Sequence, residues 1–148
     1  MSDALVPRLT AVTLGVQDFH ASLKFYEALG FKRKVRATGD EIAFLDGGGV
    51  VLALFRWDDL AADGKLPAAP RPQAFRGTTL AWNCASVEDV EAAFARALAA
   101  GAKPLKRPEK TSFGGHSGYF ADPDGHAWEV VHVPNFSLTA DGRLALPD

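Results

Sequence analysis

The most informative segment of the sequence is a predicted hairpin at residues 118–129. It reads Gly118-Tyr119-Phe120-Ala121-Asp122-Pro123-Asp124-Gly125-His126-Ala127-Trp128-Glu129. Two short, mainly apolar runs flank a segment rich in aspartate, proline and glycine, which is the composition of a chain reversal. The stretch therefore predicts a hairpin with its turn at 122–125. Because side chains alternate along a strand, Glu129 is expected on the face opposite to Trp128 and His132.

Outward from this hairpin, the chain contains the same order of elements twice. Each half predicts a strand, a capped helix and three further strands, at 9–16, 18–30, 31–37, 41–45 and 50–55, and again at 78–84, 86–101, 103–105, 118–121 and 126–133. Aligning the turn at Asp46 with that at Asp122 gives an offset of 76, which pairs Phe44 with Phe120 and Ala53 with Glu129. This order predicts an α+β domain built from two tandem modules.

The length and composition are those of one globular domain. The chain has 148 residues, 47% apolar residues and a formal net charge of −2, so disorder and fibrous repeats are excluded. We expect a single domain over 1–148, with module 1 over about 8–56, a proline-rich linker over 57–76, module 2 over about 77–134 and a C-terminal tail over 135–148.

The net charge and the lengths of the apolar runs limit the classes of partner, and the single cysteine indicates the cellular compartment. A near-neutral chain lacks the strongly basic character of most nucleic-acid-binding proteins, and no apolar run approaches the ~20 residues of a membrane span. The lone Cys84 cannot form an internal disulfide, which favours the reducing cytoplasm.

Two basic clusters, at 32–36 and 103–110, are expected to protect exposed strand edges, with attraction of an anionic ligand as the alternative.

Three segments carry a resemblance to a known family: Val12-Thr13-Leu14-Gly15-Val16-Gln17-Asp18, Phe25-Tyr26-Glu27-Ala28-Leu29-Gly30-Phe31 and the hairpin quoted above. Together they resemble the vicinal oxygen chelate superfamily, which includes glyoxalase I, extradiol dioxygenases, fosfomycin-resistance enzymes and bleomycin-binding proteins. The resemblance covers roughly 9–134. It implies two paired β-α-β-β-β modules, a curled mixed sheet around a cavity, and a homodimer.

Metal-using relatives bind a divalent ion through side chains of the first and last strand of each module. Carried over by this resemblance, the four positions are Ala11, Ala53, Thr79 and Glu129. Only Glu129 offers a strong ligand, because alanine has no donor atom and a threonine hydroxyl is a poor one. We therefore expect no cofactor, and leave open a weakly bound divalent metal.

Glu129 is the main catalytic candidate, as a general base or hydrogen-bond anchor; the alternative is a carboxylate left over from an ancestral metal site. His116 is the second catalytic candidate, because its glycine-rich loop could reach over a ligand, with simple loop packing as the alternative. Strand alternation and loop position add a set of ligand-binding candidates: Thr13, Phe55, Trp57, Thr79, Asn83 and Phe113.

Two functions remain open from the sequence. In the first, the protein binds or sequesters a small, largely apolar compound without a metal, as bleomycin-binding relatives do. In the second, it is a glyoxalase-like lyase or isomerase in which Glu129 moves a proton while His116, Thr79 and Asn83 orient a carbonyl or hydroxyl of the substrate. Cys84 shares the face of Trp82 and is expected to be an inert buried thiol.

Overall fold

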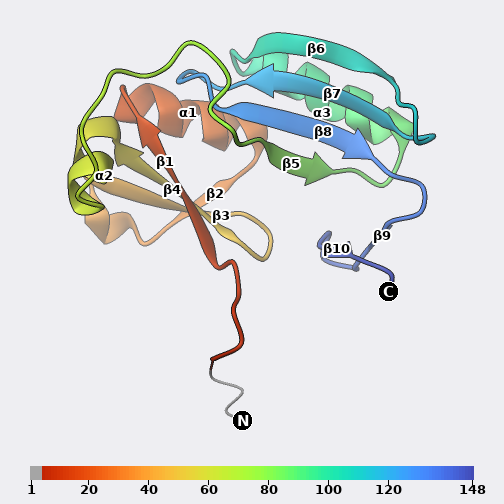
Figure 1. Ribbon diagram of the computed structural model, residues 1–148, viewed down its shortest axis with the longest axis horizontal. Helices are drawn as coiled ribbons and strands as arrows, with labels where there is room; N and C mark the ends of the chain where they lie inside the picture. Colours follow the sequence, from red (N-terminus) through yellow and green to blue (C-terminus); the bar gives the residue numbers. More distant parts are fainter. Residues whose placement is uncertain (1–4) are drawn as a thin grey trace.

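The computed structural model, which describes residues 5–148, consists of two β-α-β-β-β modules joined by a linker (Figure 1). The first four residues of the predicted domain lie outside the described part. Module 1 comprises β1 (Ala11–Val16), α1 (Phe19–Leu29), β2 (Lys32–Lys34), the short 3₁₀ helix η2 (Arg36–Thr38), β3 (Ile42–Asp46) and β4 (Val51–Arg56). The linker contains α2 (Trp57–Asp63), and module 2 comprises β5 (Leu80–Asn83), α3 (Val87–Ala99), β6 (Lys103–Lys110), β7 (His116–Ala121) and β8 (Ala127–His132). The predicted α+β class and tandem modules are confirmed.

Two elements differ from the sequence-based expectation. Strand β6 is longer than the predicted 103–105 and continues to Lys110 through two register shifts, so its bulges hid the strand pattern. The C-terminal tail, for which no elements were predicted, forms a hairpin of β9 (Ser137–Leu138) and β10 (Leu144–Ala145).

Helix α1 begins and ends where the sequence predicts. The side chain of Asp18 accepts a hydrogen bond from the Ala21 amide at 3.0 Å, and Gly30 ends the helix with φ 112°. Its buried face includes Phe19, Leu23 and Tyr26, as the helical spacing indicates. Helix α3 occupies the same place in module 2 and is capped by Ser86 in the same way.

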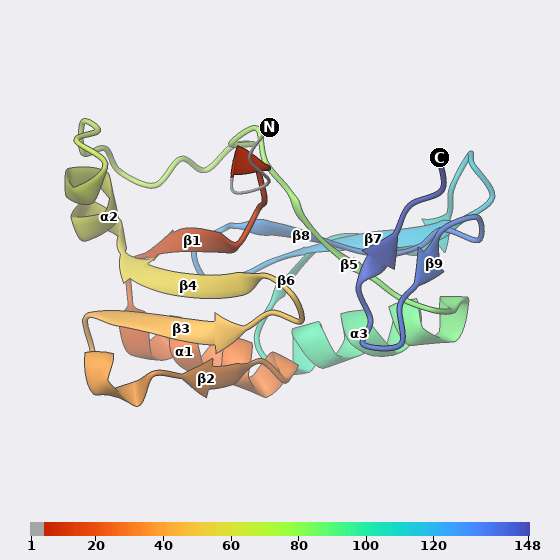
Figure 2. The same cartoon turned by 90° about the horizontal axis from the view of Figure 1, so that it is seen from below.

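Each module forms one four-stranded mixed sheet. The strand orders are β1-β4-β3-β2 in sheet 1 and β5-β8-β7-β6 in sheet 2, with β1 parallel to β4 and β5 parallel to β8. Helices α1 and α3 each cover one face of their sheet, and we call the other face the helix-free face. The two helix-free faces point in different directions (Figures 1 and 2).

The strand register corrects one pairing between the modules. Phe44 lies opposite Ala53 in sheet 1, whereas Glu129 in sheet 2 lies opposite Tyr119, not Phe120. The second hairpin therefore differs from the first by one residue, and Tyr119 is the counterpart of Phe44. Phe120 instead points into the core and is fully buried.

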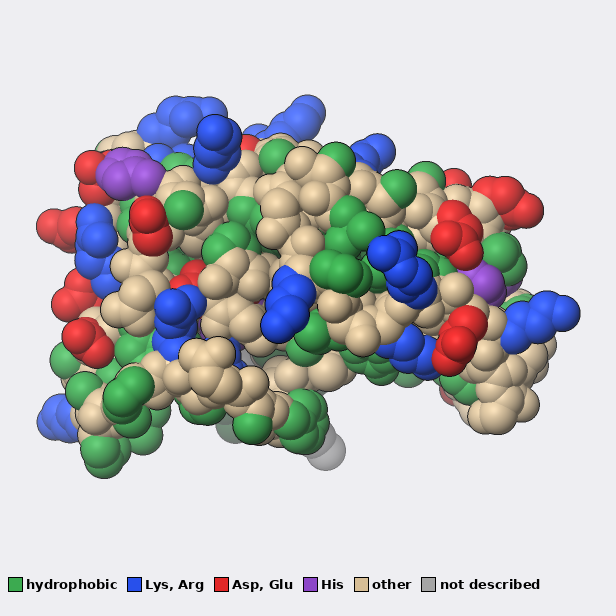
Figure 3. Space-filling view, turned by 90° about the horizontal axis from the view of Figure 1, so that it is seen from above, with side chains coloured by type: hydrophobic (Ala, Val, Ile, Leu, Met, Phe, Trp, Pro, Cys, Tyr) green, Lys and Arg blue, Asp and Glu red, His purple; other side chains and the backbone are tan. Residues whose placement is uncertain are grey.

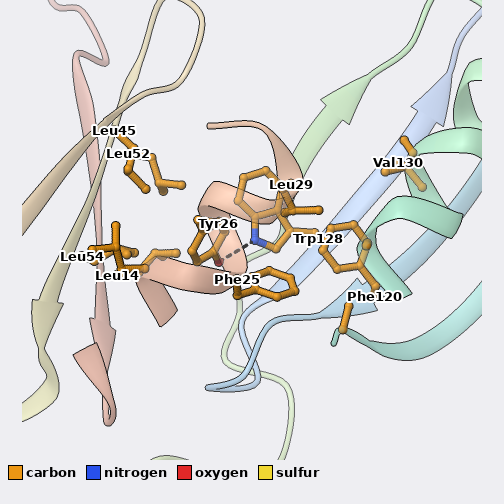
Figure 4. Packing of buried hydrophobic residues seen from close by; sticks show 14 of the residues in the cluster. Leu14, Phe25, Tyr26, Leu29, Leu45, Leu52, Leu54, Phe120, Trp128 and Val130 are labelled. Carbon is orange, nitrogen blue, oxygen red and sulfur yellow. Dashed lines mark hydrogen bonds between the residues drawn. The ribbon is translucent and has the colours of Figure 1, made fainter. Parts of the chain in front are cut away.

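A single apolar core runs through both modules. Phe25 and Tyr26 on α1 point toward the second module, where their rings meet Phe120 and Trp128 at centroid distances of 6.4 and 5.9 Å (Figure 4). On its other side α1 packs against sheet 1 residues such as Leu54. Because one core is shared, burial of apolar surface favours one placement of the two modules.

The four sheet edges differ in charge. The outer edges, β2 and β6, hold the lysines of both basic clusters, as expected for strands protected against unwanted pairing. The inner edges, β1 and β5, contain no charged residue. On the face shown in Figure 3, basic side chains are interspersed with acidic ones and form no continuous patch. None of the helices within residues 5–148 has the length and apolar character to span a membrane.

Candidate active face of module 2

Strand β8 places Glu129 on the helix-free face of sheet 2, where it is partly buried. Its register partners are Tyr119 on β7 and Ala81 on β5. Burial, together with the negative charge of Glu129, raises the pKa of Tyr119. The phenol is therefore protonated at neutral pH and can donate a hydrogen bond beside a carboxylate that can accept one. Ala81 is too small to cover the other side of Glu129.

Tyr119 was not among the site residues predicted from the sequence. Its signal was present in the hairpin, because residues 119 and 129 are equally far from Asp124 and so lie opposite each other in a symmetric reversal. The alignment of Phe44 with Phe120 concealed this pairing. It assumed that the two strands of the second hairpin pair at the same sequence separation as those of the first, which would place Phe120 opposite Glu129.

The predicted ligand-binding residues lie on both modules. Thr13 and Phe55 are on sheet 1, and both face its helix-free side together with Ala53. Asn83 on β5 lies opposite Val131, and Thr79 directly precedes β5. Since the helix-free faces point in different directions, one chain does not bring the sheet 1 residues to Glu129 (Figure 2).

His116 lies on the opposite side of sheet 2 from Glu129. It shares its face with Phe120 in the alternation of β7, and its Nε2 is 2.9 Å from Oε1 of Glu91 on helix α3. His116 is thus the first residue of strand β7 and not part of the glycine-rich loop as predicted, and its side chain lies against helix α3 instead of over the ligand face. Phe113, in the same loop, is 56% exposed and lies against Gly115.

The four positions implied by the family resemblance do not fit a divalent metal. Ala11 and Ala53 contribute no donor atom, and Thr79 contributes one hydroxyl beside the carboxylate of Glu129. Within residues 5–148, no group of three or more histidine, cysteine, aspartate or glutamate side chains is arranged to hold a metal ion. Burial raises the pKa of the Cys84 thiol to about 11, which fits the predicted inert thiol.

The carboxylate of Asp122 accepts hydrogen bonds both within its own turn and from helix α1. One oxygen of Asp122 accepts a hydrogen bond from the Tyr26 hydroxyl at 2.6 Å, and the other accepts from the amides of Asp124 and His126 at 2.9 and 2.8 Å. The indole of Trp128 donates to the Tyr26 oxygen at 3.0 Å. Burial raises the pKa of Asp122, against the opposing effect of these hydrogen bonds. The turn therefore joins module 2 to helix α1 of module 1.

Asp124 and its neighbours extend this connection to the linker. The Asp124 carboxylate accepts hydrogen bonds at 2.8 Å from the Gln17 amide of module 1 and from Nη1 of Arg71 in the linker. Arg76 donates to the Asp124 carbonyl at 2.6 Å. The imidazole of His126 lies 2.8 Å from the Gly15 carbonyl, so this histidine has a definite structural role. The most family-specific segment of the sequence thus holds the modules and linker together.

Trp57 belongs to this connection as well. Its indole stacks on His126 with ring centroids 6.2 Å apart, and the guanidinium of Arg76 lies 5.3 Å from the indole centroid. The indole nitrogen donates to the carbonyl of Ala69 at 2.7 Å. Trp57 is therefore held by linker contacts and lies away from Glu129.

Two hollows mark the surface. The larger, of about 1060 Å³, lies between the modules, is bordered by the β9-β10 hairpin and is lined by Thr79 and Asn83 among others. The smaller, of about 540 Å³, lies beside Trp57 and the linker. Neither of these two hollows includes Glu129 among its lining residues.

Comparison with known proteins agrees with this architecture. A glyoxalase-related enzyme from Fulvimarina pelagi has 33% sequence identity and a TM-score of 0.86, over 97% of this chain and 100% of that chain. A glyoxalase/bleomycin resistance protein/dioxygenase from Nocardioides has 27% identity and a TM-score of 0.71, over 86% and 83% of the two chains. A lactoylglutathione lyase from Agrobacterium tumefaciens, at 19% identity, TM-score 0.65 and coverage of 86% and 95%, shares the fold.

The sequence comparisons identify the family. A 55-residue segment is 46% identical to an uncharacterized protein of Mycolicibacterium smegmatis, covering 37% of this chain and 47% of that protein, so the match spans about half of the relative's length. The family profile for the Glyoxalase/Bleomycin resistance protein/Dioxygenase superfamily matches residues 8–130. The match includes both modules and the strand that carries Glu129, and the chain belongs to this superfamily.

Proposed function

We propose that the protein binds a small, largely apolar compound at the Glu129 face of sheet 2, without a metal ion. The observation that carries this proposal is the composition of the four family positions, which hold one carboxylate and no imidazole. A carboxylate and a protonated phenol on a mostly apolar sheet resemble the usual make-up of a small-molecule site, in which a few polar groups fix the orientation. We place this activity in the cytoplasm, where the free thiol of Cys84 stays reduced.

A second copy of the chain completes the site in this proposal. The uncharged inner edges of β1 and β5 leave backbone groups without strand partners, whereas the lysine-rich outer edges discourage pairing. Edge-to-edge approach of β1 from one copy and β5 from the other would bring Thr13 and Phe55 toward Glu129. The ligand would then lie between an apolar wall and a polar one.

The oligomeric state tests this arrangement. Sedimentation should give twice the 15.8 kDa of one chain. Placing a charge on the inner edge with Thr13→Lys should favour the single chain, while the same kind of change on the outer edge, Leu105→Lys at an exposed position of β6, should leave the mass unaltered. A wild-type chain that sediments as a monomer at micromolar concentration would contradict the proposed dimer.

Metal content and ligand-induced stabilisation test the binding function. Chelator-treated protein should be stabilised by at least one member of a panel containing glutathione adducts, bleomycin and fosfomycin, because a ligand at 100 times its Kd adds about 2.7 kcal/mol to the free energy of unfolding. Near-stoichiometric zinc, nickel, manganese or iron in untreated protein, with ligand binding lost on its removal, would contradict metal independence.

The Tyr119–Glu129 pairing favours a second candidate, a glyoxalase-like lyase or isomerase. In this reaction the Glu129 carboxylate takes a proton from the carbon next to a substrate carbonyl and returns it to a neighbouring atom. Tyr119 donates a hydrogen bond to the carbonyl oxygen as negative charge develops there. Turnover that falls at least 100-fold in Glu129→Gln, with substrate binding retained, would support this candidate over sequestration.

A further inference from the structure

The carboxylate of Glu129 has no cationic partner in its own chain. None of the ion pairs formed by Lys, Arg or His side chains in residues 5–148 includes it. It is partly buried, and its neighbours across the strands are Ala81 and the ring of Tyr119. A charge in such surroundings is stabilised less by water than a fully exposed one, so a cation that reaches it gains more from the contact.

The cation in the same strand row is already neutralised. Lys106 on β6 lies opposite Tyr119 and is therefore two strands from Glu129, or about 10 Å between backbones. Its Nζ is 3.5 Å from Oε1 of Glu109 on the same strand. Lys106 and Glu109 thus pair with each other, while Lys103 lies further along β6, opposite Ala121.

One carboxylate suits an organic cation better than a metal ion. A divalent ion needs several oxygen or nitrogen ligands, and the neighbouring family positions do not supply them. An ammonium group needs one charged acceptor and a few neutral ones, and here Tyr119 offers its hydroxyl oxygen and its ring face. The remaining neighbour across the strands, Ala81, is exposed and small, and suits an apolar body.

We propose that the ligand bound at the Glu129 face is an amine, whose ammonium group pairs with the Glu129 carboxylate while its apolar part lies on sheet 2. This inference rests on the proposed function and specifies its ligand. In this arrangement the ligand itself supplies the positive charge that a metal supplies at the equivalent place in metal-using relatives.

Two probes of nearly the same shape test the charge requirement: benzylamine, which is cationic at pH 7, and benzyl alcohol, which is neutral. Their Kd values are measured by NMR titration of chelator-treated protein at low salt. Benzylamine is expected to bind about tenfold more tightly, the size of a charge-assisted hydrogen bond. Salt should weaken the binding of benzylamine only, because ions screen charge pairs.

Two matched variants locate the effect. Glu129→Gln should make the two Kd values equal, while Glu88→Gln, which removes an exposed carboxylate from helix α3 on the other side of sheet 2, should leave the tenfold preference unchanged. Equal affinities in the wild type, a preference that survives Glu129→Gln, or one lost equally in Glu88→Gln would overturn the amine inference. If both probes bind Glu129's face equally, the proposed function stands and the inference fails; if neither binds, both fail.

Discussion

The two modules contain equivalent rows of four side chains across their sheets, with different chemistry. In sheet 1 the row is Lys34, Phe44, Ala53 and Thr13; in sheet 2 it is Lys106, Tyr119, Glu129 and Ala81. The outer lysine is the same in both rows. The central pair is apolar in the first module, whereas in the second it is a phenol opposite a carboxylate, so the same fold carries different chemistry at equivalent places.

The hairpin turns of the two modules differ in a similar way. Asp46 in the first turn is exposed and accepts a hydrogen bond from Gly48, within its own turn. Asp122 in the second turn is buried and accepts hydrogen bonds from Tyr26, Asp124 and His126. Module 2 therefore contributes both the polar pair of the site and the turn that holds the modules together.

The largest effect is expected at the second turn. Asp122→Ala leaves the Tyr26 hydroxyl and two buried amides without their acceptor, which should lower the free energy of unfolding by about 3 to 4 kcal/mol. The matched change Asp46→Ala removes one exposed hydrogen bond and should cost less than about 1 kcal/mol. Urea unfolding measures both values. Equal losses would show that the second turn has no special role between the modules.

Exchanging the central residues tests the two rows. Ala53 is 1% exposed, so Ala53→Glu buries a charge and should cost about 3 kcal/mol of unfolding free energy. Glu129→Ala removes a partly exposed carboxylate that forms no ion pair among the described residues, and should change stability by less than about 0.5 kcal/mol. Thermal unfolding of the two variants checks this. Loss of stability in Glu129→Ala as large as in Ala53→Glu would assign Glu129 to the structure instead of the site.

The pH dependence of stability tests the burial of Asp122. Its pKa in the folded chain lies above the ordinary 3.8, so between these two values the folded chain binds more protons at this site than the unfolded chain. The free energy of unfolding contributed by Asp122 therefore falls as the pH rises through that window, by at most about 1.4 kcal/mol per pH unit. Asp122→Asn removes this contribution.

The measurement is the difference in unfolding free energy between wild type and Asp122→Asn at successive pH values upward from 3.8. The difference should shrink with rising pH. A wild-type advantage that grows with pH would mean that the hydrogen bonds lower the pKa of Asp122 more than burial raises it.

The smallest effect is a shift in the titration of Tyr119. The negative charge of Glu129 contributes to its raised pKa, so Glu129→Gln should lower the midpoint of phenolate formation. Ultraviolet difference spectra between pH 8 and 12 follow this titration, with Tyr119→Phe identifying the signal. An unchanged midpoint would show that the two side chains do not interact.

Sequence reasoning predicted the parts of the fold that depend on local patterns. The caps at Asp18, Gly30 and Ser86 indicate the helix boundaries, and the alternation of side chains along β8 placed Glu129 and Trp128 on different faces of the sheet. Strand β6 was predicted too short because its bulges interrupt the alternating pattern. Local patterns thus describe elements well where their geometry is regular.

The residues of the proposed site could be predicted only in part from the sequence, for a physical reason. Glu129 follows from strand alternation and family position, but Tyr119 depends on the register of one hairpin, and a shift of one residue moves a side chain to the other face. The bonds from His116 to Glu91 and from His126 to Gly15 join residues 25 and 111 positions apart. Such contacts arise from tertiary packing, which periodicity in one sequence does not describe.

An NMR titration of chelator-treated protein with benzyl alcohol measures whether a small molecule binds at Glu129 without a metal. Saturable shifts are expected for the amide signals of Ala81, Tyr119 and Glu129, which are neighbours in the strand register. Shifts confined to the groove between the modules, for example around Trp82, or shifts that arise only after a divalent metal is added, would contradict metal-free binding at Glu129.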